Sequence, residues 1–238
     1  MRRMLAIVTG LIALIGVSGM TATTANAAPS VGLGGGAGIV IADSALCTLT
    51  TIGYDGAGRL VGLTAGHCGG SGSTVKAEKT MGSGVLGVIR QSNRTWDYAV
   101  IEFDKSKVTP QRSYRGLTIS GPGPRPVFGQ TACKAGRTTG TTCGIVWGDD
   151  PQVPTFTLSQ VCSNHGDSGA PIVVGDKVVG LLNGGRIIQN LGGTGLDIDV
   201  PCTDPNIPIH NPTISTPMTS ILADLNGRNT VGSGFRAV

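Results

Sequence analysis

Short apolar runs separated by glycine-rich turns recur along most of the chain, and they constrain its fold more than any other feature. The 238 residues include 39 glycines, and the runs are closely spaced and rich in valine and isoleucine. Tight turns at residues 55–58 and 175–176 each separate two such runs. This pattern is typical of an all-β protein.

The strand pattern breaks once, at residues 120–126, where three prolines and two glycines disfavour any strand or helix. Two β-modules joined there are the economical architecture. Its expected parts are a signal peptide (1–27), a short N-terminal segment (28–37), a first module (38–119), the linker (120–126), a second module with a helix (127–226) and a tail (227–238). Expected strands lie at 38–42, 47–54, 59–64, 85–90, 97–103, 144–147, 155–158, 171–174 and 177–182.

One helix is expected, at residues 217–225. Ser215 or Thr216 would cap it, and Pro217 would take its first position. The glycine-rich stretch 31–38 shows little reason to be rigid.

The first residues have the layout of a secretory signal peptide. Arg2 and Arg3 precede an apolar run at 4–17, and small residues at 25–27 suit cleavage before Ala28. A membrane anchor is the alternative, but a spanning helix needs about 20 apolar residues. We therefore expect export, with no stable membrane insertion after cleavage.

Whether the six cysteines are expected to form disulfides depends on this export. An even number in a secreted chain indicates disulfides, and sequence alone permits fifteen pairings. None forms a Cys-x-x-Cys pair, so a structural metal site is not expected. The simplest pairing is sequential: Cys47 with Cys68, Cys133 with Cys143, and Cys162 with Cys202.

Three separated motifs offer the groups of an activated serine nucleophile. His67 lies in Thr-Ala-Gly-His-Cys, Asp97 in Trp-Asp-Tyr-Ala-Val and Ser168 in Gly-Asp-Ser-Gly-Ala-Pro. A serine hydroxyl needs an imidazole to take its proton and a carboxylate to orient that imidazole. Each motif alone also has a structural interpretation, such as an ordinary turn. Together, in the order His, Asp, Ser, they predict a catalytic triad in the cleft between the modules.

These motifs and the segments 133–144 and 162–171 resemble the chymotrypsin-type serine peptidases. They are most similar to the secreted bacterial branch, the streptogrisins and α-lytic protease. Residues 133–144 resemble the short disulfide loop of that branch, and Cys162 stands six residues before the nucleophile, as it does there. The resemblance covers roughly residues 38–225. It implies two six-stranded β-barrels packed around an active-site cleft, with a short C-terminal helix.

The resemblance also implies a role for each residue of the motifs. His67 would act as general base and then general acid, and Asp97 would accept a bond from its other ring nitrogen. Ser168 would carry the acyl group. The backbone amides of Gly166 and Ser168 would form the oxyanion hole, where glycine lets the backbone approach the developing anion.

A further set of residues would bind substrate: Ser163, Asn164, His165, Leu182, Asn183, Gly184, Gly185 and Arg186. No carboxylate occupies the expected base of this pocket, so a preference for Lys or Arg is not expected. Ser163, His165 and Arg186 leave two alternatives at the cleavage position, a small-to-medium apolar residue, which we favour, or an acidic one.

Other positions extend or depart from the family pattern. Asp167 would be buried in an ion pair, and Lys134, directly after the loop cysteine, is the expected partner. Ala170 replaces the usual glycine and would crowd the nucleophile turn, while Asn183 replaces the usual serine beside Asp97 and could weaken its hydrogen bonding. The segment 187–212 is longer than expected; a lid or a partner-binding loop are alternatives to a solvated insertion, which we favour.

These observations predict an extracellular or cell-wall-associated serine endopeptidase that forms an acyl-enzyme on a peptide or protein substrate. No cofactor or metal is expected. The net charge of +4, partly in the signal peptide, is too weak to indicate nucleic acid, and a monomer is expected. The alternative is a silent or weak pseudo-peptidase that binds a protein or surface ligand through the cleft or segment 187–212. An esterase with the same triad is a third hypothesis, which peptide and ester substrates would separate from the first.

Overall fold

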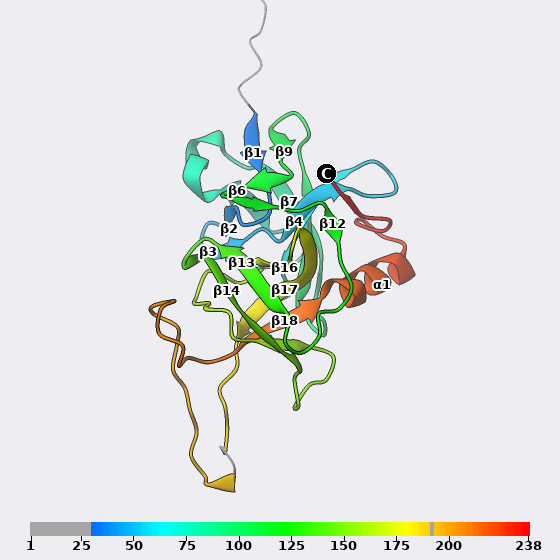
Figure 1. Ribbon diagram of the computed structural model, residues 1–238. Helices are drawn as coiled ribbons and strands as arrows, with labels where there is room; N and C mark the ends of the chain where they lie inside the picture. The colour runs from blue at the N-terminus through cyan, green and yellow to red at the C-terminus, as the bar shows by residue number, and fades with distance from the viewer. Residues whose placement is uncertain (1–29, 191–192) are drawn as a thin grey trace, which may run out of the picture.

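The computed structural model describes residues 30–190 and 193–238, and its regular secondary structure is mostly strands (Figure 1). The predicted signal peptide lies outside the described residues. The N-terminal half contains β1 (Val31–Leu33), β2 (Gly38–Ile41), β3 (Ala45–Thr48), β4 (Thr51–Tyr54), β5 (Leu60–Ala65), β6 (Thr74–Ala77), β7 (Gly87–Asn93), β8 (Tyr98–Phe103), β9 (Val108–Pro110), β10 (Ser113–Tyr114) and β11 (Leu117–Thr118), with 3₁₀ turns at Gly66–Cys68 and Glu78–Ser83. The C-terminal half contains β12 (Gly121–Pro122), β13 (Thr131–Gly136), β14 (Gly140–Asp149), β15 (Thr157–Ser159), β16 (Pro171–Val174), β17 (Lys177–Gly185), β18 (Thr213–Pro217), α1 (Met218–Arg228) and β19 (Arg236–Ala237). The prediction of an all-β class is confirmed.

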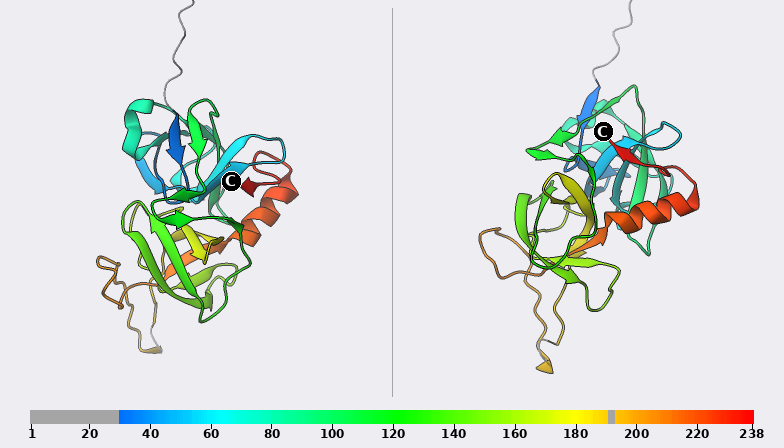
Figure 2. Two further views of the ribbon diagram at one scale, coloured as in Figure 1. Left: turned by 45° about the horizontal axis from the view of Figure 1, so that its top comes forward. Right: turned by 45° about the vertical axis from the view of Figure 1, so that its right-hand side comes forward.

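Each half of the chain builds most of one large sheet, with β19 from the C-terminal end added to the first, and the two sheets form two lobes (Figure 2). The first sheet has the order β19-β4-β5-β8-β7-β6-β2-β3 and curls into a half-barrel. The second has the order β12-β17-β16-β13-β14-β15-β18, and β17 also pairs with β18, which closes a six-stranded barrel. Among the described residues, no pairing closes the first sheet in the same way.

The strand burial patterns follow from these sheets. All six residues of β5 are buried: the strand pairs with β4 and β8 along its edges, and its Leu60, Val61, Leu63 and Ala65 belong to the main core. In β14 burial alternates: Thr142 and Val146 face the barrel interior, whereas Ile145 and Trp147 are exposed. The helix α1 buries Met218, Ile221 and Leu225 in the main core.

Three local expectations were wrong. The glycine-rich stretch contains β1, which pairs with β9 in parallel and buries Leu33. Within the linker, β12 pairs with β17, because the ladder uses the N–H groups of Ser120 and Gly123 and needs none from the proline. The helix begins at Met218 without a side-chain cap, because Ser215 and Thr216 belong to β18.

The two lobes are joined where the predicted nucleophile lies. β3 ends at Thr48, whose backbone N–H donates to Ser168 O at 2.8 Å. Thr48 Oγ1 also donates to Gly166 O at 2.9 Å, and Thr50 Oγ1 donates to Gly169 O at 2.6 Å. The N-terminal lobe therefore fixes the turn of the C-terminal lobe that carries Ser168.

Candidate active site

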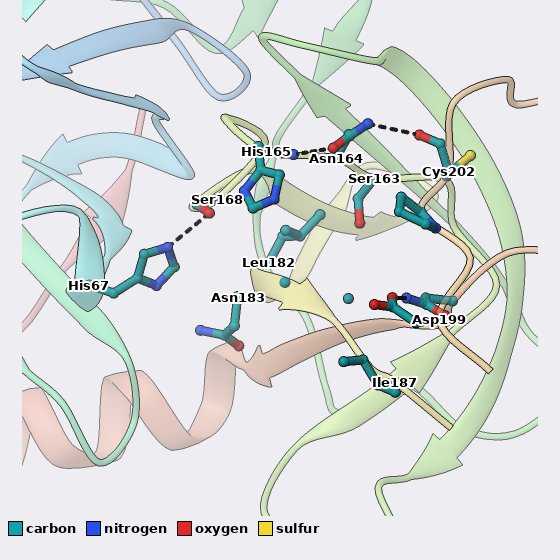
Figure 3. A pocket seen from close by; sticks show the side chains of 14 residues that line it. His67, Ser163, Asn164, His165, Ser168, Leu182, Asn183, Ile187, Asp199 and Cys202 are labelled. Carbon is teal, nitrogen blue, oxygen red and sulfur yellow. Dashed lines mark hydrogen bonds between the residues drawn. The ribbon is translucent and has the colours of Figure 1, made fainter. Parts of the chain in front are cut away.

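His67, Asp97 and Ser168 meet at the boundary of the two lobes (Figure 3 shows His67 and Ser168). His67 lies in the 3₁₀ turn after β5, Asp97 directly precedes β8, and Ser168 lies in the turn before β16. His67 Nε2 lies 2.8 Å from Ser168 Oγ, and His67 Nδ1 lies 2.8 Å from Asp97 Oδ2. The backbone N–H of His67 donates to Asp97 Oδ1 at 2.7 Å. Both carboxylate oxygens of Asp97 therefore hold the histidine.

The positions of His67 and Asp97 depend on close backbone packing. Gly66 lies against the backbone of Asn93 and Tyr98, where a Cβ atom would come within 2.8 Å of Asn93 O and 2.9 Å of Tyr98 N. Asp97 has a φ of 45°, a left-handed conformation that aspartate tolerates better than most residues. The turn before it is held by Asn93 Oδ1, which accepts bonds from the N–H groups of Thr95 (2.9 Å) and Trp96 (3.2 Å).

Asn183 supports the Asp97 carboxylate directly. Its Nδ2 donates to Asp97 Oδ2 at 2.9 Å and to Asp97 O at 3.0 Å. Thr216 Oγ1 donates to Trp96 O at 2.7 Å and lies 3.0 Å from Asn183 Oδ1, and the two Asp97 acceptors set which end of the amide faces Asp97. The expectation that Asn183 weakens the hydrogen bonding of Asp97 was wrong, because the longer amide reaches two of its oxygens.

The backbone conformation around Ser168 leaves two N–H groups free to bind an anion. Gly166 has a φ of 92° and Gly169 a φ of 85°, which only glycine adopts without strain. The N–H groups of Gly166 and Ser168 donate to no acceptor within residues 30–190 and 193–238, so both are available to a bound group. Ala170 is buried in the barrel interior, where its methyl group packs in a core cluster with Ile172 instead of crowding the turn.

Asp167 and Lys134 form the expected ion pair beneath this turn. Lys134 Nζ lies 3.3 Å from Asp167 Oδ2, and both side chains are 0% exposed. Asp167 Oδ1 accepts bonds from the N–H groups of Thr138 (2.9 Å) and Thr139 (3.2 Å), and Oδ2 accepts from Asn164 N at 3.1 Å. Burial lowers the pKa of the Lys134 ammonium, and the negative charge of Asp167 opposes that shift. The paired carboxylate thus ties the nucleophile turn to the loop between β13 and β14.

The three disulfides join the pairs that the sequential prediction gives. Cys47–Cys68 ties the His67 turn to β3, and Cys133–Cys143 crosslinks β13 and β14. Cys162–Cys202 ties the nucleophile segment to the long segment 187–212.

A cavity of about 510 Å³ opens beside Ser168 (Figure 3). Its walls come from the nucleophile segment, the end of β17 and the long segment: His67, Ser163, Asn164, His165, Ser168, Leu182, Asn183, Gly184, Gly185, Ile187, Asp199, Pro201, Cys202 and Asn211. Seven of the eight expected substrate-binding residues are among them. The volume lies in the range of small-ligand pockets. The long segment is thus not only a solvated insertion, because part of it forms a wall of this cavity.

Arg186 is the exception among the expected binding residues. Its guanidinium forms an ion pair with buried Asp150, and its Nη1 donates to Gln152 Oε1 at 3.1 Å. This partner holds the side chain away from the cavity. Sequence reasoning also missed Asp199, which no motif singled out and which lies in the cavity wall.

Solved structures with the same fold are chymotrypsin-like serine peptidases. Thermobifida fusca protease A matches with a TM-score of 0.63 at 21% identity, over 87% of this chain and 99% of that one. Nocardiopsis protease matches with a TM-score of 0.60 at 25% identity, over 82% and 96%. No protein-family model matches the chain.

Curated relatives carry corresponding names. Serine protease 2 of Streptomyces fradiae is 29% identical over 177 residues, 68% of this chain and 99% of the relative. Serine protease 1 of Rarobacter faecitabidus is 31% identical over 160 residues, and streptogrisin-C of Streptomyces griseus is 30% identical over 143. These matches cover 60% and 55% of this chain, but only 29% and 30% of the two longer relatives. In sequence and in fold the chain is similar to the bacterial chymotrypsin-like serine peptidases, which include the streptogrisins.

Proposed function

We propose that the chain is an exported serine endopeptidase that cleaves peptide bonds through an acyl-enzyme on Ser168. The observation that carries this proposal is the continuous set of contacts from Ser168 Oγ to His67 Nε2 and from His67 Nδ1 to Asp97 Oδ2, each 2.8 Å long. A nucleophile, a base and an orienting carboxylate at these distances form the geometry that serine acylation needs.

In the first half of the reaction, Ser168 Oγ attacks the carbonyl carbon of the substrate while its proton passes to His67 Nε2. The carbonyl oxygen becomes an oxyanion, which the N–H groups of Gly166 and Ser168 bind. Asp97 stabilises the imidazolium that forms, and Asn183 holds that carboxylate in place. His67 then gives the proton to the leaving amine, the C–N bond breaks, and the acyl group remains on Ser168.

In the second half, His67 takes a proton from a water molecule that attacks the ester carbonyl. The second oxyanion occupies the same two N–H groups. When it collapses, the bond from the acyl carbon to Ser168 Oγ breaks, and His67 returns the proton to the serine. The products are a carboxylic acid and the free enzyme, so no cofactor enters the balance.

Two observations weigh against the alternative of a pseudo-peptidase, which the departures at Ala170 and Asn183 favoured weakly. Ala170 packs in the core, and Asn183 donates two hydrogen bonds to Asp97. An esterase would use the same groups, and comparing peptides with esters of the same acyl group distinguishes the two.

Export is supported by the disulfides. All six cysteines are paired, and disulfides persist mainly in oxidising compartments. No helix within the described ranges 30–190 and 193–238 is long and apolar enough to cross a membrane. We propose that cleavage after Ala27 releases a monomeric chain, with the linker at 120–126 between its two lobes.

A fluorophosphonate probe tests the proposed function, because it reacts with an activated serine and the labelled position can be mapped. We expect the purified protein to be labelled at Ser168, and labelling to be lost in Ser168→Ala and His67→Ala. Failure of the disulfide-bonded wild type to react would contradict the proposal.

A further inference from the structure

The long segment 187–212 places a carboxylate in the wall of the active-site cavity. We propose that Asp199 is a specificity residue that selects peptides with lysine or arginine directly before the cleaved bond, the P1 position. This inference rests on the proposed peptidase function and adds a substrate class to it. It replaces the expectation of an apolar or acidic P1 residue, which considered only the family's usual pocket base.

Asp199 is held in place by contacts on both sides. Asn211 Nδ2 donates to Asp199 Oδ1 at 2.7 Å. The neighbouring Val200 pairs with the same asparagine, since Val200 N donates to Asn211 Oδ1 at 3.0 Å and Asn211 N donates to Val200 O at 2.7 Å. Two further backbone bonds join Ile188 and Ile198 at 3.0 and 2.8 Å. The long segment is therefore a ribbon at this point, and its ladder fixes the position of the carboxylate.

The disulfide adds a covalent constraint to this arrangement. Cys202, three positions after Asp199, is bonded to Cys162 at the start of the nucleophile segment. Asn164 Nδ2 donates to Cys202 O at 3.1 Å, so the same wall is tied twice to the segment that carries Ser168. A residue held in this way has the rigid support that a specificity contact requires.

The charge of the cavity wall favours a cation. Among the described residues that line the cavity, Asp199 is the only Asp or Glu, and none is Lys or Arg. Arg186, the cation expected there, is neutralised by buried Asp150. Asp199 forms no ion pair with any of the described residues, so its Oδ2 remains available to a substrate ammonium or guanidinium.

The shape of the cavity suits a long side chain with a charged end. His67 and Asp199 lie on opposite sides of the close-up, with Leu182 and Asn183 between them (Figure 3). A Cβ atom added to Gly184 would contact nothing within 4 Å, so the path past β17 is open. Leu182 and Ile187 can cover the methylene groups of lysine or arginine while the charged end reaches the carboxylate.

The test compares peptides that differ only at P1, with Lys, Arg, Leu or Glu, on the wild type and on Asp199→Asn. We expect kcat/KM of the wild type to be at least about tenfold higher for Lys and Arg than for Leu or Glu, the size of one charge-assisted hydrogen bond. In Asp199→Asn the ratio of Lys to Leu should fall by about tenfold. This ratio is internal to each preparation, so a partly folded variant still gives a valid result.

The matched control is Asp197→Asn. It removes the same charge from the same exposed segment, but Asp197 does not line the cavity, and its bond from Asn190 N needs only a side-chain oxygen. The control should keep the ratio of the wild type. A wild type that prefers Leu or Glu, or equal effects of the two variants, would overturn the role of Asp199 while Ser168 still reacts with the fluorophosphonate. Loss of both cleavage and labelling in the wild type would overturn the peptidase function as well.

Discussion

Replacing Lys134 by methionine removes the cation that forms an ion pair with a fully buried carboxylate. Lys134 Nζ lies 3.3 Å from Asp167 Oδ2, and neither side chain is exposed. Breaking a buried pair by removing one partner costs about 3–5 kcal/mol. Asp167 keeps backbone donors from Thr138, Thr139 and Asn164, so we expect the lower end, about 3 kcal/mol of unfolding free energy.

Thermal unfolding of the disulfide-bonded protein measures this loss. For a chain of this size, about 3 kcal/mol corresponds to a Tm lower by about 6–12 °C. The control is Arg90→Met, which removes an exposed pair: Arg90 Nε lies 2.7 Å from Glu102 Oε2, with the side chains 51% and 27% exposed. It should cost less than about 1 kcal/mol.

The double variant Lys134→Met/Asp167→Asn identifies the cause. It leaves no unpaired buried charge, so it should be more stable than Lys134→Met alone. If Lys134→Met loses no more stability than the Arg90 control, the buried pair does not hold the nucleophile turn and the reasoning is refuted.

Three further perturbations follow from single contacts. Asn183→Ala removes both hydrogen bonds that the Asn183 amide donates to Asp97, so kcat for a peptide should fall by about 10–100-fold with little change in Tm. An unchanged kcat would show that the amide does not position the carboxylate. In Gly169→Ala, at a φ of 85°, the added methyl group would overlap the backbone of β3, whereas in the matched control Gly175→Ala, at a φ of 62°, it would meet open space. Only Gly169→Ala should abolish secretion or labelling; equal loss in both variants would assign the effect to backbone strain alone. Burial raises the pKa of Asp55, but bonds from Gly232 and Arg59 outweigh burial and hold it below the ordinary value. Stability from these bonds is present above about pH 4 and is lost as pH falls through the lowered pKa. In urea unfolding, Asp55→Asn should therefore have a lower free energy of unfolding than the wild type at pH 7, and this free energy should fall less steeply as the pH is lowered. The same pH dependence of the free energy of unfolding in both proteins would contradict this.

The predictions from sequence that concern short motifs agree best with the structure. His67, Asp97 and Ser168 each stand in a motif whose neighbours have a physical reason to be there, such as Gly166 beside the nucleophile. The sequential disulfides follow from loop closure within each lobe. Lys134 could be paired with Asp167 only through the resemblance, because 33 positions separate them.

Contacts between distant segments could not be predicted. Asp199 reaches the cavity because a ribbon folds back and Cys202 is tied to Cys162, and no local pattern encodes that path. The sequence pattern favoured Thr216 as a helix cap, yet pairing with β17 places it in a strand, where its hydroxyl donates to Trp96 O and lies beside Asn183. Arg186 was also predicted to bind substrate, but its guanidinium forms an ion pair with Asp150. This buried carboxylate comes from a distant loop, so no local pattern indicates the contact.

The acyl-enzyme is the central claim, and direct observation of it is the most decisive measurement. The protein is mixed with an activated ester whose acyl group is released slowly, and leaving group and intact mass are followed together. We expect a burst of leaving group equal to the enzyme concentration and one acyl group on Ser168, both absent from Ser168→Ala. Steady hydrolysis without a burst, with no mass change on Ser168, would contradict the account.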